Sequence, residues 1–357
     1  MTAATIDQAK AEAFAGQVVG MLNSAMSSLL VSVGHRLGIF DKLATMPPST
    51  AEQIAKATNL NERYIREWLG GMTSARIVEH DAAKGTYWLP AEHAASVTRA
   101  AGPGNLASMM EFVALMGNVE DQIVESFQKG GGAPYSSFPK FQELMANMSA
   151  QIFDAALIEG VLPLVAGLPD RLRAGIDVAD VGCGSGHAIN LMAKAFPKSR
   201  FTGYDFSEEG VKRGRAEATD LGVANATFEV KDVSTLGGPA RFDLMTAFDS
   251  IHDQAQPRKV LKGIAEALRP DGVFLMVDIA ADSTHAGNME HPLAAAFYSI
   301  STFHCMTVSL ALGGEGLGTM WGEQKARELL EEAGFKDIDI KHVEGDIMNA
   351  YYICKKA

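Results

Sequence analysis

The chain has 357 residues, enough for two or three domains, and its content of 47% hydrophobic and 21% charged residues is typical of folded globular proteins. A net charge of −12 and the absence of a basic run longer than Lys355–Lys356 disfavour nucleic acid as a partner. No uninterrupted apolar stretch reaches about 18 residues and no signal peptide is evident, so we expect neither a membrane span nor secretion. Three widely spaced cysteines match no disulfide or zinc pattern, which favours a reducing, cytoplasmic location.

Residues 1–100 indicate a mainly helical domain that contains a winged helix. Residues 7–45 carry a broad apolar stripe at helical spacing. Two shorter helical patterns, AEQIAKATNL and NERYIREWLGGM, follow as a helix-turn-helix. The stretches ARIVEH and GTYWL are joined by a polar turn and predict a two-stranded wing.

A winged helix often binds DNA, and the net charge of its second helix indicates whether it can attract DNA phosphates. Four charged residues cancel there: Arg63, Arg66, Glu62 and Glu67. Because neutralised phosphates supply most of the non-specific affinity of DNA-binding proteins, this helix can contribute little of it. We expect no nucleic-acid partner, and a DNA-binding regulator is the alternative.

The chain changes its pattern near residue 173. Residues 101–172 read as further helices, broken by the loop GGGAPYSSFP, and we expect them to roof the site. Their methionines and phenylalanines are typical of core packing, although a flexible apolar pocket wall would have the same sequence. Residues 173–357 alternate strands and helices, as in a doubly wound sheet, with an insertion at 282–322. The final stretches, DIDIKHVEG and NAYYICKK, can form a hairpin.

The stretch GIDVADVGCGSGH, from Gly175 to His187, predicts a ligand site. Its apolar run ends in glycines at alternate positions: Gly182, Gly184 and Gly186. Glycines allow a tight turn and close approach to a ligand, and the helix that follows directs its N-terminus there. The dinucleotide fingerprint needs its third glycine at the sixth position, which His187 occupies. Asp180 lies beside the loop, and Asp205 ends the next apolar run, where a ribose-binding acid is expected.

With five ordered strands around it, the loop DVGCGSG resembles that of the class I methyltransferases that use S-adenosyl-L-methionine (SAM). Together with the winged helix, it is similar to the bacterial branch related to plant small-molecule O-methyltransferases. The resemblance covers most of the chain and implies an α/β fold, with a Rossmann-like seven-stranded SAM domain behind the N-terminal winged helix. It also implies SAM as cofactor, S-adenosyl-L-homocysteine as product, a small-molecule acceptor and a homodimer formed by the N-terminal domain.

The same resemblance assigns the glycines to the methionine part of SAM and Asp205 to both ribose hydroxyls, because an ionised carboxylate only accepts hydrogen bonds. Phe206 would cover the adenine face, and Asp232, with Val233 beside it, would lie near the adenine amino group. Either acid could instead cap a helix or turn, and His187 could touch the SAM carboxylate or be solvated. The cofactor-binding set is Asp180, Gly182, Gly184, Gly186, His187, Asp205, Phe206, Asp232, Val233 and Phe248.

The catalytic candidate is His252, in AFDSIHDQAQP after the fourth predicted strand, where ligands of open α/β sheets bind. A histidine with a pKa of ~6.5 can take a proton at neutral pH. In the plant O-methyltransferases, the pair matching His252 and Asp253 carries the general base, and Asp278 matches an acid that orients it. The alternative is a hydrogen-bonded loop histidine. Gln254 stands where that family usually has tryptophan.

We therefore predict methyl transfer from SAM to a small, partly apolar metabolite, most favourably at a hydroxyl. Transfer to sulfur or nitrogen is the first alternative, since a thiol pKa of ~8.5 demands less help from a base. A SAM-sensing regulator is the second. Asp249 and Asp253 have no third oxygen ligand nearby in the sequence, so we expect no metal. His304 could face the acceptor or be a buried structural histidine, and GGEGLG indicates a flexible cover or a plain turn.

Overall fold

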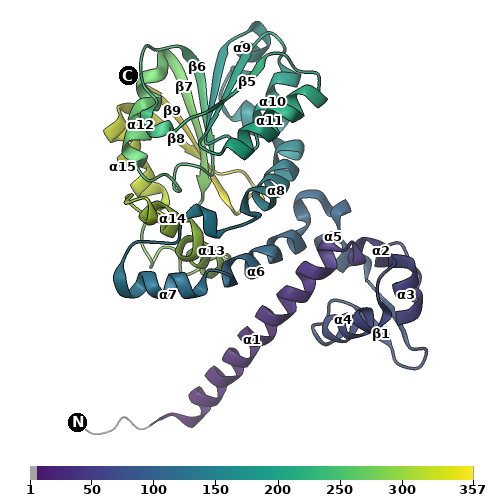
Figure 1. The fold of residues 1–357 in the computed structure, drawn as a ribbon. Helices are drawn as coiled ribbons and strands as arrows, with labels where there is room; N and C mark the ends of the chain where they lie inside the picture. Colours follow the sequence, from purple (N-terminus) through teal and green to yellow (C-terminus); the bar gives the residue numbers. More distant parts are fainter. Residues whose placement is uncertain (1–5, 357) are drawn as a thin grey trace. The chain divides into compact units, whose positions relative to one another are not determined.

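The structure is a computed structural model that describes residues 6–356, and it separates into two compact units, Met1–Gly117 and Asn118–Ala357. Figure 1 shows both units in the colours of the sequence. The boundary falls within residues 101–172, so the segment expected to roof the site is divided between the two units.

The first unit contains the expected winged helix. Its elements are α1 (Gln8–Arg36), α2 (Ile39–Leu43), α3 (Ala51–Thr58), α4 (Glu62–Ser74), β1 (Glu79–Asp81), β2 (Thr86–Trp88), α5 (Ala91–Val97), η1 (Arg99–Gly104), η2 (Leu106–Met110) and α6 (Glu111–Gly117). β1 and β2 pair antiparallel as the wing. Thr50 and Gln53 form a capping box at the start of α3. The helix expected over residues 7–45 is broken at Gly38, whose φ of 67° is left-handed.

Helix α1 is exposed along most of its length. Its exposed large apolar side chains are Phe14, Val18, Val19, Met21, Leu22, Met26 and Val33. No charged residue occurs in the sequence from Ala13 to Gly34. By length and by a mean hydropathy of 1.3 over 18 residues, of which 6% are buried, α1 could cross a membrane. The expectation of no membrane span considered only uninterrupted apolar runs, and it stays a prediction.

The second unit is a seven-stranded sheet, as the resemblance implied. The strands are β3 (Asp177–Val181), β4 (Arg200–Asp205), β5 (Ala226–Val230), β6 (Phe242–Phe248), β7 (Leu268–Ile279), β8 (Phe335–Lys341) and β9 (Asn349–Lys356). Their order is β5-β4-β3-β6-β7-β9-β8. The first five are parallel, and β9 lies antiparallel between β7 and β8, which confirms the terminal hairpin.

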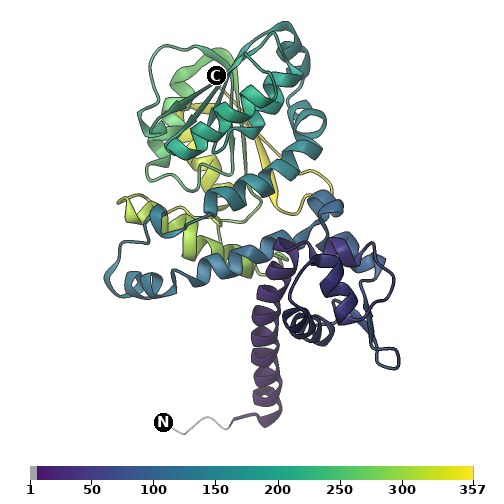
Figure 2. The same ribbon diagram turned by 45° about the vertical axis from the view of Figure 1, so that its right-hand side comes forward.

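Helices cover both faces of this sheet. The helices of this unit are α7 (Glu120–Lys129), η3 (Tyr135–Ser137), α8 (Phe141–Ala156), η4 (Leu157–Val161), η5 (Leu162–Leu164), α9 (Leu168–Ala174), α10 (His187–Ala195), α11 (Glu208–Asp220), η6 (Val233–Thr235), α12 (Pro257–Ala267), α13 (Ala294–Ile300), η7 (Ser301–Cys305), α14 (Met306–Ala311) and α15 (Gly322–Ala333). Figures 1 and 2 show α12 and α15 on one face and α10 and α11 on the other. Successive strand residues point to opposite faces, so Val178 and Ala179 of β3 belong to different hydrophobic clusters.

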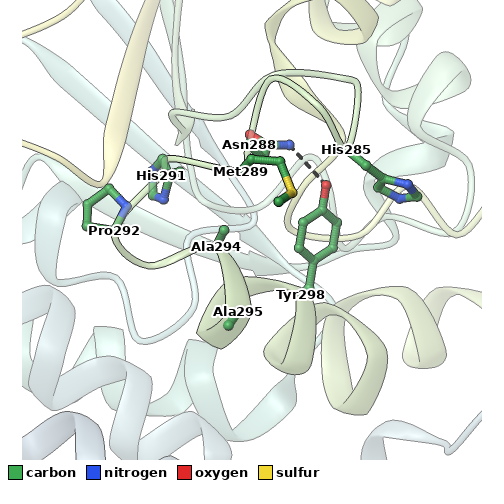
Figure 3. A pocket seen from close by; sticks show the side chains of 8 residues that line it. All are labelled: His285, Asn288, Met289, His291, Pro292, Ala294, Ala295 and Tyr298. Atoms are coloured by element: carbon green, nitrogen blue, oxygen red, sulfur yellow. Dashed lines mark hydrogen bonds between the residues drawn. The ribbon is translucent and has the colours of Figure 1, made fainter. Parts of the chain in front are cut away.

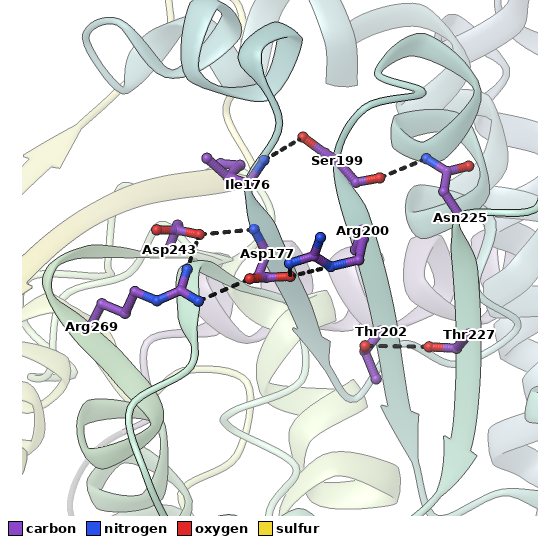
Figure 4. Close-up of polar contacts among 9 residues, drawn as sticks. All are labelled: Ile176, Asp177, Ser199, Arg200, Thr202, Asn225, Thr227, Asp243 and Arg269. Atoms are coloured by element: carbon purple, nitrogen blue, oxygen red, sulfur yellow. Dashed lines mark hydrogen bonds and ion pairs between the residues drawn. The ribbon is translucent and has the colours of Figure 1, made fainter.

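Ion pairs join the amino ends of four neighbouring strands (Figure 4). Asp177, the first residue of β3, pairs with Arg200 of β4 at 2.6 Å and with Arg269 of β7 at 2.9 Å. Arg269 also pairs with Asp243 of β6. The candidate site residues lie at the opposite, carboxyl ends of these strands, so the ionic network and the site occupy different edges of the sheet.

Candidate active site

Two glycines of the loop after β3 pack tightly against other side chains, and the third has open space where a side chain would lie. All three glycines have positive φ: Gly182, Gly184 and Gly186. An added Cβ would lie 2.6 Å from Ser250 at the first position and 2.2 Å from Phe228 at the third. At Gly184 it would meet nothing within 4 Å. Packing against Ser250 and Phe228 therefore requires glycine at positions 182 and 186, whereas Gly184 borders open space.

Asp205 ends β4 beside this open space. Its Oδ2 accepts a hydrogen bond from the Gly184 N–H, and its Oδ1 accepts one from the Ser207 N–H, both at 2.8 Å. The side chain is buried, and burial raises the pKa of its carboxyl group. Each oxygen of an ionised carboxylate has room for a second donor. Asp205 is thus fixed to the glycine loop and can still accept hydrogen bonds from two hydroxyls.

A buried histidine–carboxylate pair lies after β6 and at the end of β7. His252 Nδ1 is 2.7 Å from Asp278 Oδ1, and both side chains are buried. The same Asp278 oxygen accepts hydrogen bonds from the Ile279 N–H and from Trp321 Nε1, at 2.8 and 3.1 Å. Three donors therefore orient one carboxylate oxygen, and this carboxylate fixes the ring of His252 with Nε2 on the other side.

Two further carboxylates lie near this ring. Asp253 Oδ1 is 3.3 Å from His252 Nε2. Burial lowers the pKa of His252, but the charges of Asp278 and Asp253 outweigh it and raise that pKa well above its usual value. Burial, followed by the charge of Asp278, raises the pKa of Asp249 to about 7. Three carboxyl groups, those of Asp249, Asp253 and Asp278, therefore lie near this one imidazole.

Comparison with known proteins agrees with this geometry. Residues 25–99 match the family described as Rv2258c-like winged HTH domain, and residues 172–334 match that described as methyltransferase domain. The crystal structure of human N-acetylserotonin methyltransferase in complex with SAM covers 100% of both chains at 18% identity, with a TM-score of 0.69. The mitomycin 7-O-methyltransferase MmcR covers 98% of this chain and 99% of its own at 20% identity, with a TM-score of 0.72. Residues 172–334 form a class I SAM-dependent methyltransferase domain.

Curated relatives match this methyltransferase chain over part of their length. The 27-O-demethylrifamycin SV methyltransferase of Amycolatopsis mediterranei (strain S699) is 34% identical over 132 residues, which are 36% of this chain and 45% of that protein. The chain spans about half or less of the length of such relatives, 40% to 52% for the first four. Their acceptors differ, so the comparisons establish the domain and its fold.

The loop of the methyltransferase domain fits SAM. The open space at Gly184 lies beside Asp205, which has acceptor capacity for the ribose hydroxyls. Phe206, which follows Asp205, is 57% exposed and contacts the ring of Tyr135 edge-on at 5.4 Å. An exposed ring next to a carboxylate with free acceptor capacity can cover a purine. Phe248 ends β6, at the same edge of the sheet, and its ring contacts Phe153 of α8.

Three of the expected cofactor residues have partners within the protein. Asp180 is buried, accepts a hydrogen bond from Thr246 Oγ1 at 2.6 Å, and has a pKa that burial raises to about 7. Asp232 accepts a hydrogen bond from the Ser234 N–H and caps the short helix η6, as its alternative interpretation stated. Val233 is buried. Asp180 and Val233 are therefore enclosed by the protein, and Asp232 is the one of the three with an exposed side chain.

His187 is placed differently from the expectation. Its Nδ1 pairs with Glu217 of α11, and its Nε2 lies 3.0 Å from Asp154 of α8. The hydrogen bond to Glu217 raises the pKa of His187. Both ring nitrogens are thus occupied, and the side chain ties two helices together, which leaves no ring nitrogen for the SAM carboxylate. The sequence could not show this, because both partners are about 30 residues away along the chain.

An aromatic group covers the histidine side of the site. His304, in the π-helix η7 of the insertion, is fully buried and stacks on Phe141 at 3.5 Å between ring centroids. Tyr135 and Phe138 contact it edge-on. Burial lowers the pKa of His304 to about 4, so this ring is neutral at pH 7. Short π-helical turns occur frequently at functional sites.

The segment GGEGLG packs on the loop that carries His252. The Gly318 N–H donates to the His252 carbonyl oxygen at 3.3 Å, and the Glu315 N–H donates to that of Ala255 at 3.0 Å. This backbone pairing indicates a fixed support rather than a flexible cover. It also brings Trp321 to Asp278, a contact that sequence reasoning missed.

Two surface hollows lie elsewhere in the methyltransferase unit. The larger, of ≈ 420 Å³, is formed by residues 285–292 and α13, and Figure 3 shows Tyr298 hydrogen-bonded to Asn288 within it. The other, of ≈ 340 Å³, lies between α7 and residues 298–303. Neither is lined by residues of the glycine loop or by His252.

Proposed function

We propose that this protein transfers the methyl group of SAM to a hydroxyl of a small-molecule acceptor, with His252 as general base. The observation that carries the proposal is the His252–Asp278 pair at the same sheet edge as the glycine loop and Asp205. In open α/β sheets, ligands bind at the carboxyl ends of the strands. The similarity to mitomycin 7-O-methyltransferase over nearly the whole chain supports oxygen as the nucleophile.

SAM supplies a methyl group that is already activated on a sulfonium. The residues of this chain have two tasks, to hold the acceptor oxygen in line and to remove its proton. Asp278 accepts from His252 Nδ1, which leaves the lone pair of Nε2 for the acceptor proton. The imidazolium that results is stabilised by Asp278 and Asp253. A raised pKa makes the neutral ring of His252 a stronger acceptor for the proton of a weakly acidic hydroxyl, once the ring has lost its own Nε2 proton.

The aromatic group completes the proposed acceptor site. Tyr135 links its two sides, because its ring contacts both Phe206, beside Asp205, and His304. The neutral, buried rings of Phe138, Phe141 and His304 exclude water and leave the carboxylates as the charged groups around the reacting atoms. We therefore propose a small, partly apolar acceptor that carries one hydroxyl.

The test uses SAM labelled with an isotope in its methyl group and a fractionated metabolite extract. Wild-type protein is compared with His252→Ala, and labelled products are followed by mass. A labelled product that falls by about 10²–10⁴-fold in the variant supports His252 as base. A product that persists at the wild-type rate overturns the base and points to a sulfur or nitrogen acceptor. SAM binding with no labelled product overturns the enzymatic proposal and favours the SAM-sensing regulator, which a duplex-binding assay then examines.

We propose in addition that the protein is a cytoplasmic homodimer that uses neither DNA nor a membrane. The cysteines are free thiols: Cys183, Cys305 and Cys354. Such thiols suit a reducing compartment. The uncharged, exposed length of α1 supports a second copy as the partner, because two such helices bury each other's apolar side chains.

A further inference from the structure

We infer that His252, Asp253 and Cys305 form a zinc-type site, and that Zn²⁺ bound there inhibits the proposed methyl transfer. The inference rests on the proposed function for its inhibitory part alone. The ligand atoms, one imidazole nitrogen, one carboxylate oxygen and one sulfur, lie within 4.8 Å of one another. This departs from the expectation of no metal, which considered carboxylate oxygens alone and had no reason to place Cys305 beside them.

The donor atoms have the spacing of a tetrahedral site. Ligands at about 2.05 Å from a tetrahedral ion are about 3.3–3.4 Å apart, and a sulfur at about 2.3 Å is about 3.5 Å from each of them. His252 Nε2 and Asp253 Oδ1 are separated by 3.3 Å. Cys305 Sγ already lies within 4.8 Å of both atoms, so a small side-chain movement brings it to the distance of a ligand. Nitrogen, oxygen and thiolate ligands together favour zinc over magnesium or calcium.

Asp253 and two neighbouring carboxylates each have one buried oxygen without a hydrogen-bond donor among the described residues. Asp253 Oδ1 is buried and has no hydrogen-bond donor among residues 6–356, although His252 Nε2 is near. Asp278 Oδ2 and Asp249 Oδ1 are also buried and have no hydrogen-bond donor within that described range. Buried carboxylate oxygens without donors are costly, and a divalent cation compensates several of them at once.

The histidine is oriented as a metal ligand is in a carboxylate–histidine–zinc arrangement. Asp278 holds Nδ1 and thereby directs Nε2 toward Asp253 and Cys305. With three protein ligands, a tetrahedral ion keeps its fourth position for water. Binding converts the Cys305 thiol to a thiolate and needs His252 with Nε2 deprotonated, so the thiol proton and the Nε2 proton of an imidazolium go to solvent. The ion then occupies the Nε2 lone pair that the acceptor proton would use, which is why it inhibits.

The experiment titrates the full-length protein, freed of metal by a chelator, with Zn²⁺ alone by calorimetry, and with Co²⁺ as a spectroscopic probe. The expected result is one saturable site per chain and a thiolate-to-cobalt absorption band. Cys305→Ala abolishes that band and weakens Zn²⁺ binding by about 100-fold or more. The conservative variant Cys305→Ser also loses the band, while Cys354→Ala, the matched buried cysteine outside the site, keeps it. Thermal unfolding of each variant verifies that it is folded.

Labelled methyl transfer is then measured with increasing Zn²⁺, and we expect inhibition in the wild type and Cys354→Ala that is relieved in Cys305→Ala. Absence of saturable binding in the wild type, or a cobalt band that survives Cys305→Ala, overturns the metal site. Binding without inhibition overturns the regulatory role. A protein that binds Zn²⁺ at this site but shows no methyl transfer under any condition overturns the proposed function and leaves the metal site intact.

Discussion

His252 and Asp278 are separated by 26 residues along the chain, yet their Nδ1 and Oδ1 atoms lie 2.7 Å apart, and Trp321 donates to the same oxygen. This arrangement predicts a graded response to mutation. Asp278→Asn should lower kcat by about 10²–10⁴-fold, because the ring loses the carboxylate that orients it. Trp321→Phe should lower kcat by about 2–10-fold, since one hydrogen bond is lost. Steady-state kinetics should show an unchanged KM for SAM, and a large rise in that KM would contradict the orienting role.

Asp205 should control SAM affinity. Asp205→Asn leaves the shape of the side chain but replaces one acceptor oxygen by a donor that faces a backbone N–H. We expect the Kd for SAM, measured by calorimetry, to rise by about 10–100-fold. Asp232→Asn is the comparison, with a smaller effect, because this side chain also caps η6. Equal effects of the two substitutions would contradict the assignment of Asp205 to the ribose.

Alanine substitutions at Gly184 and Gly186 should distinguish a glycine required for SAM binding from one required for packing. Gly184→Ala is expected to fold with a loss of about 2–4 °C in Tm, caused by its positive φ, and to weaken SAM binding because the methyl group enters the open space. Gly186→Ala should lose clearly more Tm, since its Cβ would also collide with Phe228. Thermal unfolding with and without SAM measures both effects. Equal losses of Tm in the two variants would refute the packing difference.

His187 predicts a pH dependence of stability. Its folded-state pKa is raised above 6.5, so the stability from its pairing with Glu217 is complete below pH 6.5. That stability is lost as the pH rises through the raised folded-state pKa. The Tm of the wild type should therefore fall more between pH 6 and the alkaline range than that of His187→Gln, by about 2–4 °C. Parallel curves for the two proteins would show that the ion pair adds nothing to stability.

Helix α1 predicts the oligomeric state. Val18, Leu22 and Met26 are exposed and do not belong to the winged-helix core. Replacing all three by serine therefore removes apolar surface from α1 and leaves that core unchanged. We expect light scattering coupled to gel filtration to show a dimer for the wild type and a monomer for the variant. The same changes at Val113, Val124 and Phe127, which are exposed outside α1, are the control and should leave the dimer intact. Flotation of the wild type with lipid vesicles would instead favour a membrane partner.

Hydrophobic periodicity and glycine spacing were sufficient to predict the winged helix, the alternation of strands and helices, and the terminal hairpin, because each depends on local sequence. The resemblance added the SAM domain and its seven strands. The roles of His252, Asp253 and Asp278 stay predictions, although the structure brings these three residues together.

What the sequence could not predict depends on contacts between distant elements. Trp321 contacts Asp278 across 43 residues, and no local pattern marks it. Cys305 lies in a π-helical turn, a distortion that follows from packing rather than from composition. His187 begins a helix where a SAM contact was expected, but two acids from other helices occupy its ring. In each case tertiary packing, which single-sequence patterns do not encode, decides the partner.

The ion pairs that Asp177 makes with Arg200 and Arg269 affect which parts of the sequence can be substituted during evolution. They stabilise the sheet at the amino ends of its strands. Strand β3, Asp177–Val181, separates these ion pairs from the loop that begins at Gly182. Substitutions in the loops of the opposite edge can therefore alter which acceptor is admitted while the scaffold keeps its strand register. Directed evolution of new acceptor preferences should accordingly succeed in residues 282–322 and fail when it alters the amino ends of the strands.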